Sequence, residues 1–276
     1  MAINLAGLEM KNPVTVASGT FGFGLEFADL VPLEKLGAIT TKTVTIKPRK
    51  GNPQPRLMEV EDGLVNSIGL QNDGVEYFIA NYLPELKKIK TSLIVNIAGE
   101  TVEEYAQTAE ILCRQEGISA IEVNISCPNV KKGCIAFGKD PVMTKEVISA
   151  VREACKLPLI AKLTPNVPDI TVIAKAALEG GADILSMINT VQQTTTIPGK
   201  NQSITGGLSG PAIKPTALKL ISQVRMAFHG IPIIGMGGIM GTTDAKEFFA
   251  AGANAIAVGT ANFVDPRIVI GIIKDL

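Results

Sequence analysis

The chain has 276 residues, of which 46% are hydrophobic, and its 26 basic residues balance its 26 acidic ones. A chain of this size buries a substantial core, and zero net charge gives no global attraction for nucleic acid or an anionic membrane. No apolar run approaches the ~20 residues of a membrane span, and the first residues lack a basic signal-peptide head. We therefore expect a cytoplasmic protein that acts on a small molecule.

The cysteines indicate neither a metal site nor a disulfide framework. Cys113, Cys127, Cys134 and Cys155 lack the paired spacing of zinc ligands, and reduced thiols are usual in the cytoplasm. Cys113 and Cys155 fall on predicted helices and are interpreted as small core residues.

Short apolar runs alternate with helix-period stretches along the whole chain. Residues 3–10 alternate and turn at Gly7, which predicts a hairpin at the floor of a barrel. Eight runs are apolar enough to be strands buried on both faces, namely residues 14–17, 38–43, 93–98, 120–125, 159–163, 184–188, 231–236 and 255–258. This alternation predicts an α/β protein with a single (β/α)8 TIM barrel domain that comprises residues 1–276.

Local signals also place helices and connections. Thr101 and Glu104 have capping-box spacing before an apolar helix face, and a helix around Ile170 closes at Gly180 and Gly181. Residues 45–73 and 191–210 are too long to be plain connections. We expect them to be loops that cover the C-terminal face of the strands, where barrel enzymes carry out chemistry.

Cys127 follows the predicted strand 120–125 and is flanked by Asn124 and Asn129. A thiol with a reference pKa of about 8.5 can act as an acid or a base near neutral pH, whereas a carboxamide can only bind and orient. The run therefore predicts a reaction site at the mouth of this strand.

Glycine clusters end the last two predicted strands. Gly237 and Gly238 follow one strand, and Gly259 with Thr260 follows the next. Their backbone N–H groups can approach an anion without a Cβ atom in the way, which favours a phosphate site. Either cluster alone is equally compatible with a turn that binds no ligand.

Two lysines lie within apolar strands. Lys42 and Lys162 would be costly to bury without an anionic partner. Each lysine is either exposed at the barrel rim or part of a structural ion pair, or it faces an electron-rich cofactor ring or a substrate carboxylate.

Taken together, these motifs resemble a known family. The matching segments are residues 17–19, 41–42, 51–56, 66–72, 124–129, 137–138, 188–190 and 205–215. The chain resembles the class 1 dihydroorotate dehydrogenases, and residues 130–133 resemble the NAD-linked class 1B branch, whose catalytic subunit contains FMN. The resemblance implies that dihydroorotate is oxidised to orotate in pyrimidine biosynthesis.

Residue roles follow only from this resemblance. Cys127 would remove the C5 proton of dihydroorotate while C6 delivers a hydride to FMN. Implied substrate contacts are Lys42, Asn66, Ser67, Ile68, Gly69, Leu70, Asn124, Asn189 and Thr190. Implied FMN contacts are Ser18, Lys42, Thr43, Asn96, Asn124, Lys162, Ile188, Gly210, Gly237, Gly238, Gly259 and Thr260.

The resemblance also implies partners. The chain has neither an iron–sulfur cysteine pattern nor a dinucleotide fingerprint after its first strand, so we do not expect it to use NAD directly. The resemblance implies that electrons reach NAD through a second subunit with FAD and a 2Fe–2S cluster. A homodimer of this chain would form the centre of the complex. Two alternatives stay open, a flavin-dependent dihydropyrimidine dehydrogenase subunit and a noncatalytic barrel that binds a phosphate ligand.

Overall fold

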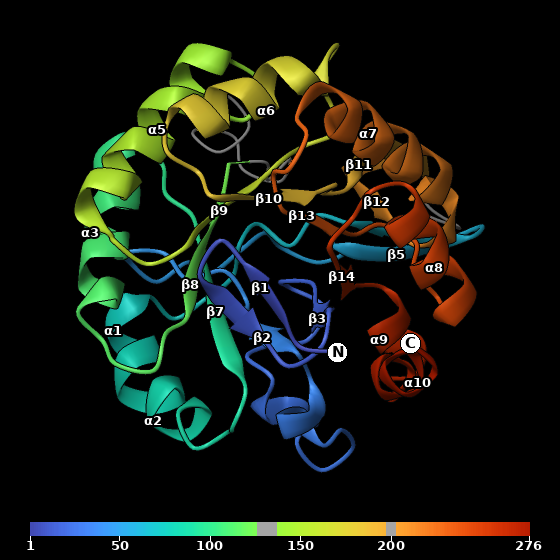
Figure 1. Cartoon of the computed structure of the whole chain (residues 1–276), viewed down its shortest axis with the longest axis horizontal. Coiled ribbons are helices and arrows are strands. Elements are labelled where there is room, and N and C mark those ends of the chain that lie inside the picture. Colours follow the sequence, from blue (N-terminus) through green and yellow to red (C-terminus); the bar gives the residue numbers. More distant parts are fainter. Residues whose placement is uncertain (126–136, 197–202) are drawn as a thin grey trace.

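The computed structural model describes residues 1–125, 137–196 and 203–276. Eight parallel strands form one sheet, and the helices surround it (Figure 1). These strands are β3 (Val14–Val16), β4 (Ala38–Thr40), β7 (Ser92–Ile97), β8 (Ala120–Asn124), β9 (Leu159–Lys162), β10 (Ile184–Met187), β13 (Ile233–Gly235) and β14 (Ala255–Val258). All eight predicted strands are confirmed, with ends that shift by up to three residues.

The sheet closes into a barrel between its first and last strands. The strand order is β3-β14-β13-β10-β9-β8-β7-β4, so β3 and β4 stand at the two ends. The backbone N–H of Gly37 donates to the Val14 carbonyl over 2.9 Å, and the Thr15 hydroxyl donates to the Ala38 carbonyl over 2.9 Å. These contacts join the two end strands, which confirms the barrel prediction.

The predicted helix signals are also confirmed. The Thr101 side chain accepts from the Glu104 N–H at the start of α3 (Val102–Cys113), and α6 (Ile170–Glu179) ends at Gly180. The other helices are α1 (Val75–Tyr77), α2 (Leu83–Leu86), α5 (Pro141–Ala154), α7 (Lys214–Ala227), α8 (Thr242–Ala250), α9 (Ala261–Val264) and α10 (Ile268–Asp275). Shorter turns are the 3-10 helices η1 (Leu25–Phe27), η2 (Leu33–Lys35) and η4 (Pro211–Ile213) and the π-helix η3 (Phe78–Tyr82).

The N-terminal hairpin closes the lower end of the barrel. Strands β1 (Ile3–Leu5) and β2 (Leu8–Met10) pair across a turn at Ala6 and Gly7, both with positive φ. This is the turn geometry that matches the twist of a two-residue hairpin. Leu8 and Met10 are buried against the first inward-facing residues of the barrel strands, as predicted.

The barrel interior has an apolar level and a polar level above it. Ile94 on β7 packs in the hairpin cluster, and Asn96 faces the same interior because strand side chains alternate with a period of two. The apolar level includes Ala38, Ile94, Ala120, Ile160 and Ile184. Two residues further along the same strands stand Thr40, Asn96, Glu122, Lys162 and Ser186, all buried. The polar level lies toward the C-terminal ends of the strands.

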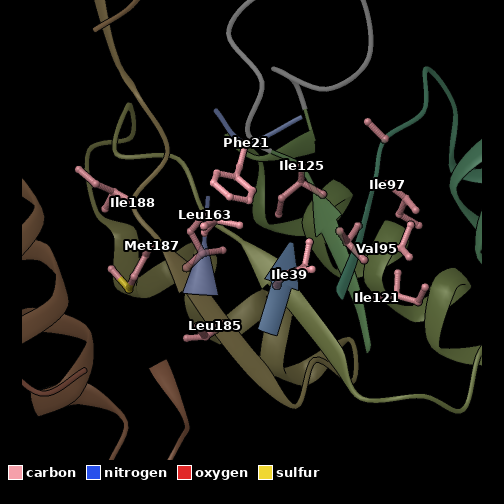
Figure 2. Packing of buried hydrophobic residues seen from close by; sticks show 14 of the residues in the cluster. Phe21, Ile39, Val95, Ile97, Ile121, Ile125, Leu163, Leu185, Met187 and Ile188 are labelled. Carbon is pink, nitrogen blue, oxygen red and sulfur yellow. The ribbon is translucent and has the colours of Figure 1, made fainter. Parts of the chain in front are cut away.

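Outward-facing strand residues form a second, larger core cluster with the helices. Val95, Ile97 and Ile121 belong to it, and Figure 2 shows these side chains with other members of the cluster. Burial on both faces of the strands explains why their sequences are almost continuously apolar.

The two long segments do cover the C-terminal face of the strands, as expected, but the prediction that they are loops is wrong. The segments form a four-stranded antiparallel sheet of β5 (Leu57–Val60), β6 (Gly63–Asn66), β11 (Val191–Thr196) and β12 (Ser203–Ser209), in the order β11-β12-β6-β5. Each segment folds into a hairpin, and β6 pairs with β12 across the two. The turn between β5 and β6 is Glu61 and Asp62, and Asp62 has φ 56°. The Asp62-Gly63 pair between hydrophobic residues was a local sign of a turn here.

Cys155 is buried in the core cluster and Cys113 packs against it, as interpreted, but the expectation of reduced thiols is wrong for these two residues. The two residues lie at the ends of α3 and α5 and are joined in a disulfide, with Cα atoms 5.7 Å apart. Neighbouring helices bring together cysteines whose spacing of 42 residues carries no local signal. Among the described residues, no helix is long and apolar enough to span a membrane, and no group of three metal-ligating acids, cysteines or histidines occurs.

We predict that Leu8→Ala lowers the free energy of unfolding by about 2–5 kcal/mol, because the lost side chain leaves a cavity in the barrel floor. Leu30→Ala is the matched control, since Leu30 is 58% exposed and its truncation is expected to change stability by less than about 0.5 kcal/mol. Urea unfolding of both variants measures the difference. Equal losses would contradict the role of the hairpin as the barrel floor.

Candidate active site

A cavity of about 350 Å³ opens at the C-terminal ends of the barrel strands. Its wall includes residues that end or directly follow four of those strands, namely Ser18, Lys42, Asn124 and Lys162. Its other side is formed by the antiparallel sheet, through residues such as Leu57 and Leu64. Barrel enzymes place their active sites at this face, so the cavity is the candidate active site.

The charged side chains on the cavity wall are all cationic. Lys42, Arg56 and Lys162 line it, and none of its described lining residues is acidic. A ligand with carboxylate or phosphate groups is favoured by such a wall, because opposite charges at short range attract strongly where water is excluded.

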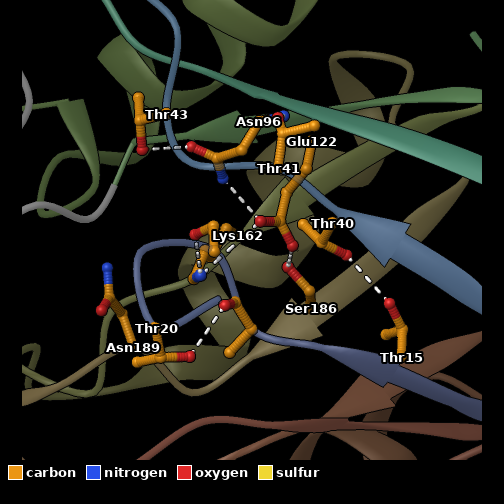
Figure 3. A network of polar contacts seen from close by, with 12 residues as sticks. Thr15, Thr20, Thr40, Thr41, Thr43, Asn96, Glu122, Lys162, Ser186 and Asn189 are labelled. Atoms are coloured by element: carbon orange, nitrogen blue, oxygen red, sulfur yellow. Dashed lines mark hydrogen bonds and ion pairs between the residues drawn. The ribbon is translucent and has the colours of Figure 1, made fainter. Parts of the chain in front are cut away.

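Lys162 is buried at the end of β9 between two partners. Its ammonium donates to the Ser18 hydroxyl over 2.9 Å and lies 3.5 Å from a carboxylate oxygen of Glu122. Glu122 also accepts from the Asn96 amide over 2.5 Å and from the Ser186 hydroxyl over 2.8 Å (Figure 3). The structural ion pair that was one alternative for Lys162 is therefore present, and the lysine borders the cavity as well.

Lys42 follows β4 and is half-buried in the cavity wall. Burial is the main influence on this side chain and lowers the pKa of Lys42 from its ordinary value of 10.5, while Asp73 and Glu26 raise it by smaller amounts. The ammonium is thus held in a site that disfavours its charge, and an anionic ligand would relieve that cost.

Carboxamides reach the cavity from separate elements. Asn124 ends β8, Asn189 follows β10, and Asn66 ends β6 in the covering sheet. The Asn66 amide donates to the Gly207 carbonyl over 3.1 Å, and the Thr190 carbonyl accepts from the Asn166 amide over 3.0 Å. These contacts fix the positions of Asn66 and Thr190 in the cavity wall.

The segment after β6 has positive φ at two successive residues, which is ordinary for Gly69 but rare for Leu70. Gly69 has φ 76° and Leu70 has φ 57°, and both line the cavity. The left-handed region costs a residue with a side chain about 1–2 kcal/mol. Asn72 supports this turn by donating to the Leu70 carbonyl over 2.8 Å. Residues held in such conformations cluster at functional sites.

The predicted phosphate residues form a group beside the cavity without lining it. Thr260 donates to the Ser209 hydroxyl over 2.8 Å, and Ser209 lines the cavity. A Cβ atom on Gly238 would lie 2.9 Å from the Gly210 carbonyl oxygen, so these backbones are in close approach. The group comprises Gly210, Gly237, Gly238, Gly259 and Thr260, with Ile188 next to Gly237.

Most of the other predicted site residues come together as expected. The cavity wall includes Ser18, Lys42, Thr43, Asn66, Ile68, Gly69, Leu70, Asn124, Lys162, Asn189 and Thr190. Asn96 does not line the cavity itself but contacts a residue that does, since it accepts from the Thr43 hydroxyl over 2.5 Å. The Ser67 hydroxyl accepts from the Asn52 amide over 3.2 Å, away from the cavity wall. Cys127 lies outside the described residues.

Sequence reasoning missed several residues, among them Arg56, Gln71 and Glu122, and also Gly19 and Ser209 on the cavity wall. Arg56 and Gln71 line the cavity and are hydrogen-bonded to each other over 2.5 Å. Glu122 is the buried partner of Lys162. An acidic residue inside an apolar strand is the same signal that identified Lys162, and applied to residues 120–125 it would have found Glu122.

A cavity of this make-up at the strand ends of a closed parallel barrel defines an α/β-barrel enzyme. A family model described as dihydroorotate dehydrogenase matches residues 1–276. The chain therefore belongs to the dihydroorotate dehydrogenase family, whose members are oxidoreductases, and the resemblance seen in the motifs is confirmed.

Individual relatives agree with the family match. The catalytic subunit of dihydroorotate dehydrogenase B (NAD(+)) from Pelobacter propionicus is 54% identical over 271 residues, which is 96% of this chain and 88% of that protein. The corresponding subunit from Alkaliphilus metalliredigens is 51% identical over 280 residues, covering 100% and 92%. The fold is similar to that of Eimeria tenella DHODH solved with ferulenol, with a TM-score of 0.83 at 24% identity over 99% of this chain and 82% of that chain.

We predict that Lys42→Met raises the free energy of unfolding near neutral pH in the absence of substrate. The folded state lowers the pKa of Lys42, so between the folded and unfolded pKa values the unfolded chain binds more protons, and wild-type stability rises with pH there. The advantage of the variant should therefore shrink as pH rises toward 10.5.

Urea unfolding across this pH range measures the effect. Lys47→Met is the control, because Lys47 is exposed and its replacement relieves no burial. A variant less stable than wild type at pH 7 would contradict the burial cost assigned to Lys42.

Proposed function

We propose that this chain oxidises dihydroorotate to orotate with a bound FMN. The observation that carries the proposal is the cavity, whose described lining combines three cations and no acid with carboxamides from separate strands. A substrate that has a carboxylate and ring amides requires this combination of cations, donors and acceptors. The family match supports the same substrate.

The residues around the cavity fit FMN. Gly19 lines the cavity with φ 88°, and a Cβ atom there would meet no atom within 4 Å, so the backbone leaves space open to a flat ring. Lys162 and Ser18 would hold the ring, and the glycine group with Thr260 would hold the phosphate. FMN, when bound, supplies the acceptor for a hydride from C6 of dihydroorotate.

The substrate would be held by side chains and by strained backbone. Lys42 is placed to pair with its carboxylate, with the backbone of Gly69 and Leu70 beside it. Asn66, Asn124, Asn189 and Thr190 offer donors and acceptors to the ring amides. Fixing a planar ring from several sides aligns it for reaction.

We assign the removal of the C5 proton to Cys127. Support comes from its position in the chain, three residues after Asn124 on the cavity wall, and from the near-neutral reference pKa of a thiol, about 8.5. The proton and the hydride would leave from adjacent carbons, so the cysteine and the flavin would act on the same bound substrate.

Electrons would leave through a second protein. The relatives are named as catalytic subunits of an NAD(+) enzyme, which supports a partner subunit. We propose that the partner carries FAD and a 2Fe–2S cluster and that two copies of this chain form the centre of the complex. A cytoplasmic location stays a prediction.

The first test is anaerobic addition of dihydroorotate to the purified, flavin-loaded protein. The flavin absorption band should bleach, and dihydrouracil, which lacks the carboxylate, should bleach it at least about tenfold more slowly because Lys42 loses its partner. Faster bleaching by dihydrouracil would favour a dihydropyrimidine dehydrogenase. A protein that binds no flavin at all would favour a noncatalytic phosphate-binding barrel.

We predict that Cys127→Ser keeps the flavin but slows its reduction by dihydroorotate by about 10²–10⁴-fold, with partial recovery at high pH, because serine is a much weaker acid than cysteine. Stopped-flow absorbance measures the rate. Cys134→Ser, the same change in the same stretch of chain, is the matched control and should reduce at the wild-type rate. Equal rates for all three proteins would remove Cys127 from the mechanism.

A further inference from the structure

Glu122 and Lys162 are the only charged side chains that are buried among the described residues. Their side chains are 3% and 4% exposed, and the shortest ammonium–carboxylate distance is 3.5 Å. Every other buried polar side chain in the described ranges is a threonine, serine or asparagine. The buried part of the described structure thus contains one ion pair, and its other polar side chains are neutral.

Stability does not explain this pair. Removing two charges from water is costly, and well-packed apolar residues of similar volume usually serve a core equally well or better. Neutral polar residues fill the same level on neighbouring strands, as Asn96 and Ser186 do. The pair therefore calls for a functional reason.

The carboxylate is held in place independently of the lysine. One oxygen of Glu122 accepts from Asn96 over 2.5 Å and the other accepts from Ser186 over 2.8 Å, so β7 and β10 fix it from both sides (Figure 3). Lys162 extends from β9 and also donates to Ser18 over 2.9 Å. The position of the ammonium is set by a fixed anion on one side and a hydroxyl on the other.

The two members of the pair stand in different relations to the cavity. Lys162 and Ser18 line it, whereas Glu122 does not. A cavity ligand can therefore touch Lys162 but not the carboxylate that Lys162 faces. Any influence of Glu122 on such a ligand passes mainly through Lys162.

We propose that Glu122 is a positioning residue that acts through Lys162 and sets the reduction potential of the bound flavin. This proposal rests on the proposed FMN site and extends it to a residue that does not touch the cofactor. Reduction by a hydride adds two electrons and one proton to the ring, which gains one negative charge. Lys162 stabilises the negative charge of the reduced ring. The fixed carboxylate of Glu122 partly compensates the Lys162 charge and so weakens this stabilisation.

The test is the reduction potential of the flavin-loaded protein, measured by equilibration with a reference dye and without dihydroorotate. Glu122→Gln keeps the shape and removes the charge, so Lys162 is no longer compensated. The ratio of reduced to oxidised flavin at a fixed potential should rise at least tenfold, which is about 30 mV for a two-electron couple. An unchanged or lower potential overturns the proposal.

Three further variants separate charge from structure. Ser186→Ala removes a hydrogen bond to the same carboxylate without changing charge, and should shift the ratio less than threefold. Glu122→Asp moves the carboxylate away from Lys162 by one methylene and should raise the potential by less than Glu122→Gln does. The Asp variant serves as the test if the Gln variant does not fold. A shift as large in Ser186→Ala as in Glu122→Gln would show a structural effect only and overturn the proposal.

Lys162→Met tests the path of the effect. This variant should itself lower the potential, and in its background Glu122→Gln should change little, because the ammonium through which Glu122 acts is absent. An equal shift in both backgrounds would show that Glu122 acts directly on the flavin. In flavin-free protein, Lys162→Met with Glu122→Gln should be more stable to urea than Lys162→Met alone, which reports on the pair without the cofactor.

The two proposals fail in different ways. A yellow protein that dihydroorotate does not reduce overturns the assigned substrate and leaves the potential measurable. A flavin that dihydroorotate reduces normally, with a potential that does not respond to Glu122→Gln, overturns only the role of Glu122.

Discussion

The alternation of side chains along the strands of the closed parallel barrel determines which residues face its interior, from the N-terminal hairpin to the cavity. Each inward position lies two residues beyond the previous one on its strand, so Ile94 in the apolar level is followed by Asn96 in the polar level. The same step leads from Ala120 to Glu122. A shift of one residue would bring the outward hydrophobic residues inside and separate the charged pair.

The hairpin and the polar level depend on each other through this register. The hairpin covers the apolar level at the lower end, and the polar level above it borders the cavity through Lys162. In that environment the electrostatic interaction between Lys162 and Glu122 is much stronger than it would be at a surface. A site that has to stabilise charge on a cofactor gains from such surroundings.

The antiparallel sheet couples two distant parts of the chain at the opposite side of the cavity. A Cβ atom on Gly206 in β12 would lie 2.1 Å from the Asn66 carbonyl oxygen, so β6 and β12 approach as closely as they do only with glycine there. Asn66 and the strained turn at Gly69 and Leu70 are thus positioned partly by residues about 140 positions later in the chain. The part of the site assigned to the substrate is thus formed by segments that are far apart in the sequence.

The sequence by itself determined the eight strands, the hairpin and the capped helices, because their signals are local periodicities and turn residues such as those at Gly7 and Thr101. It also indicated Lys42, Lys162 and the glycine clusters, since cations and glycines at the ends of apolar runs are conspicuous. Only the tertiary structure decided that residues 45–73 and 191–210 pair into one sheet, that Cys113 meets Cys155, and that Glu122 faces Lys162. These contacts join segments far apart in the chain, and no local pattern specifies which distant partner a strand edge, a thiol or a buried carboxylate will meet.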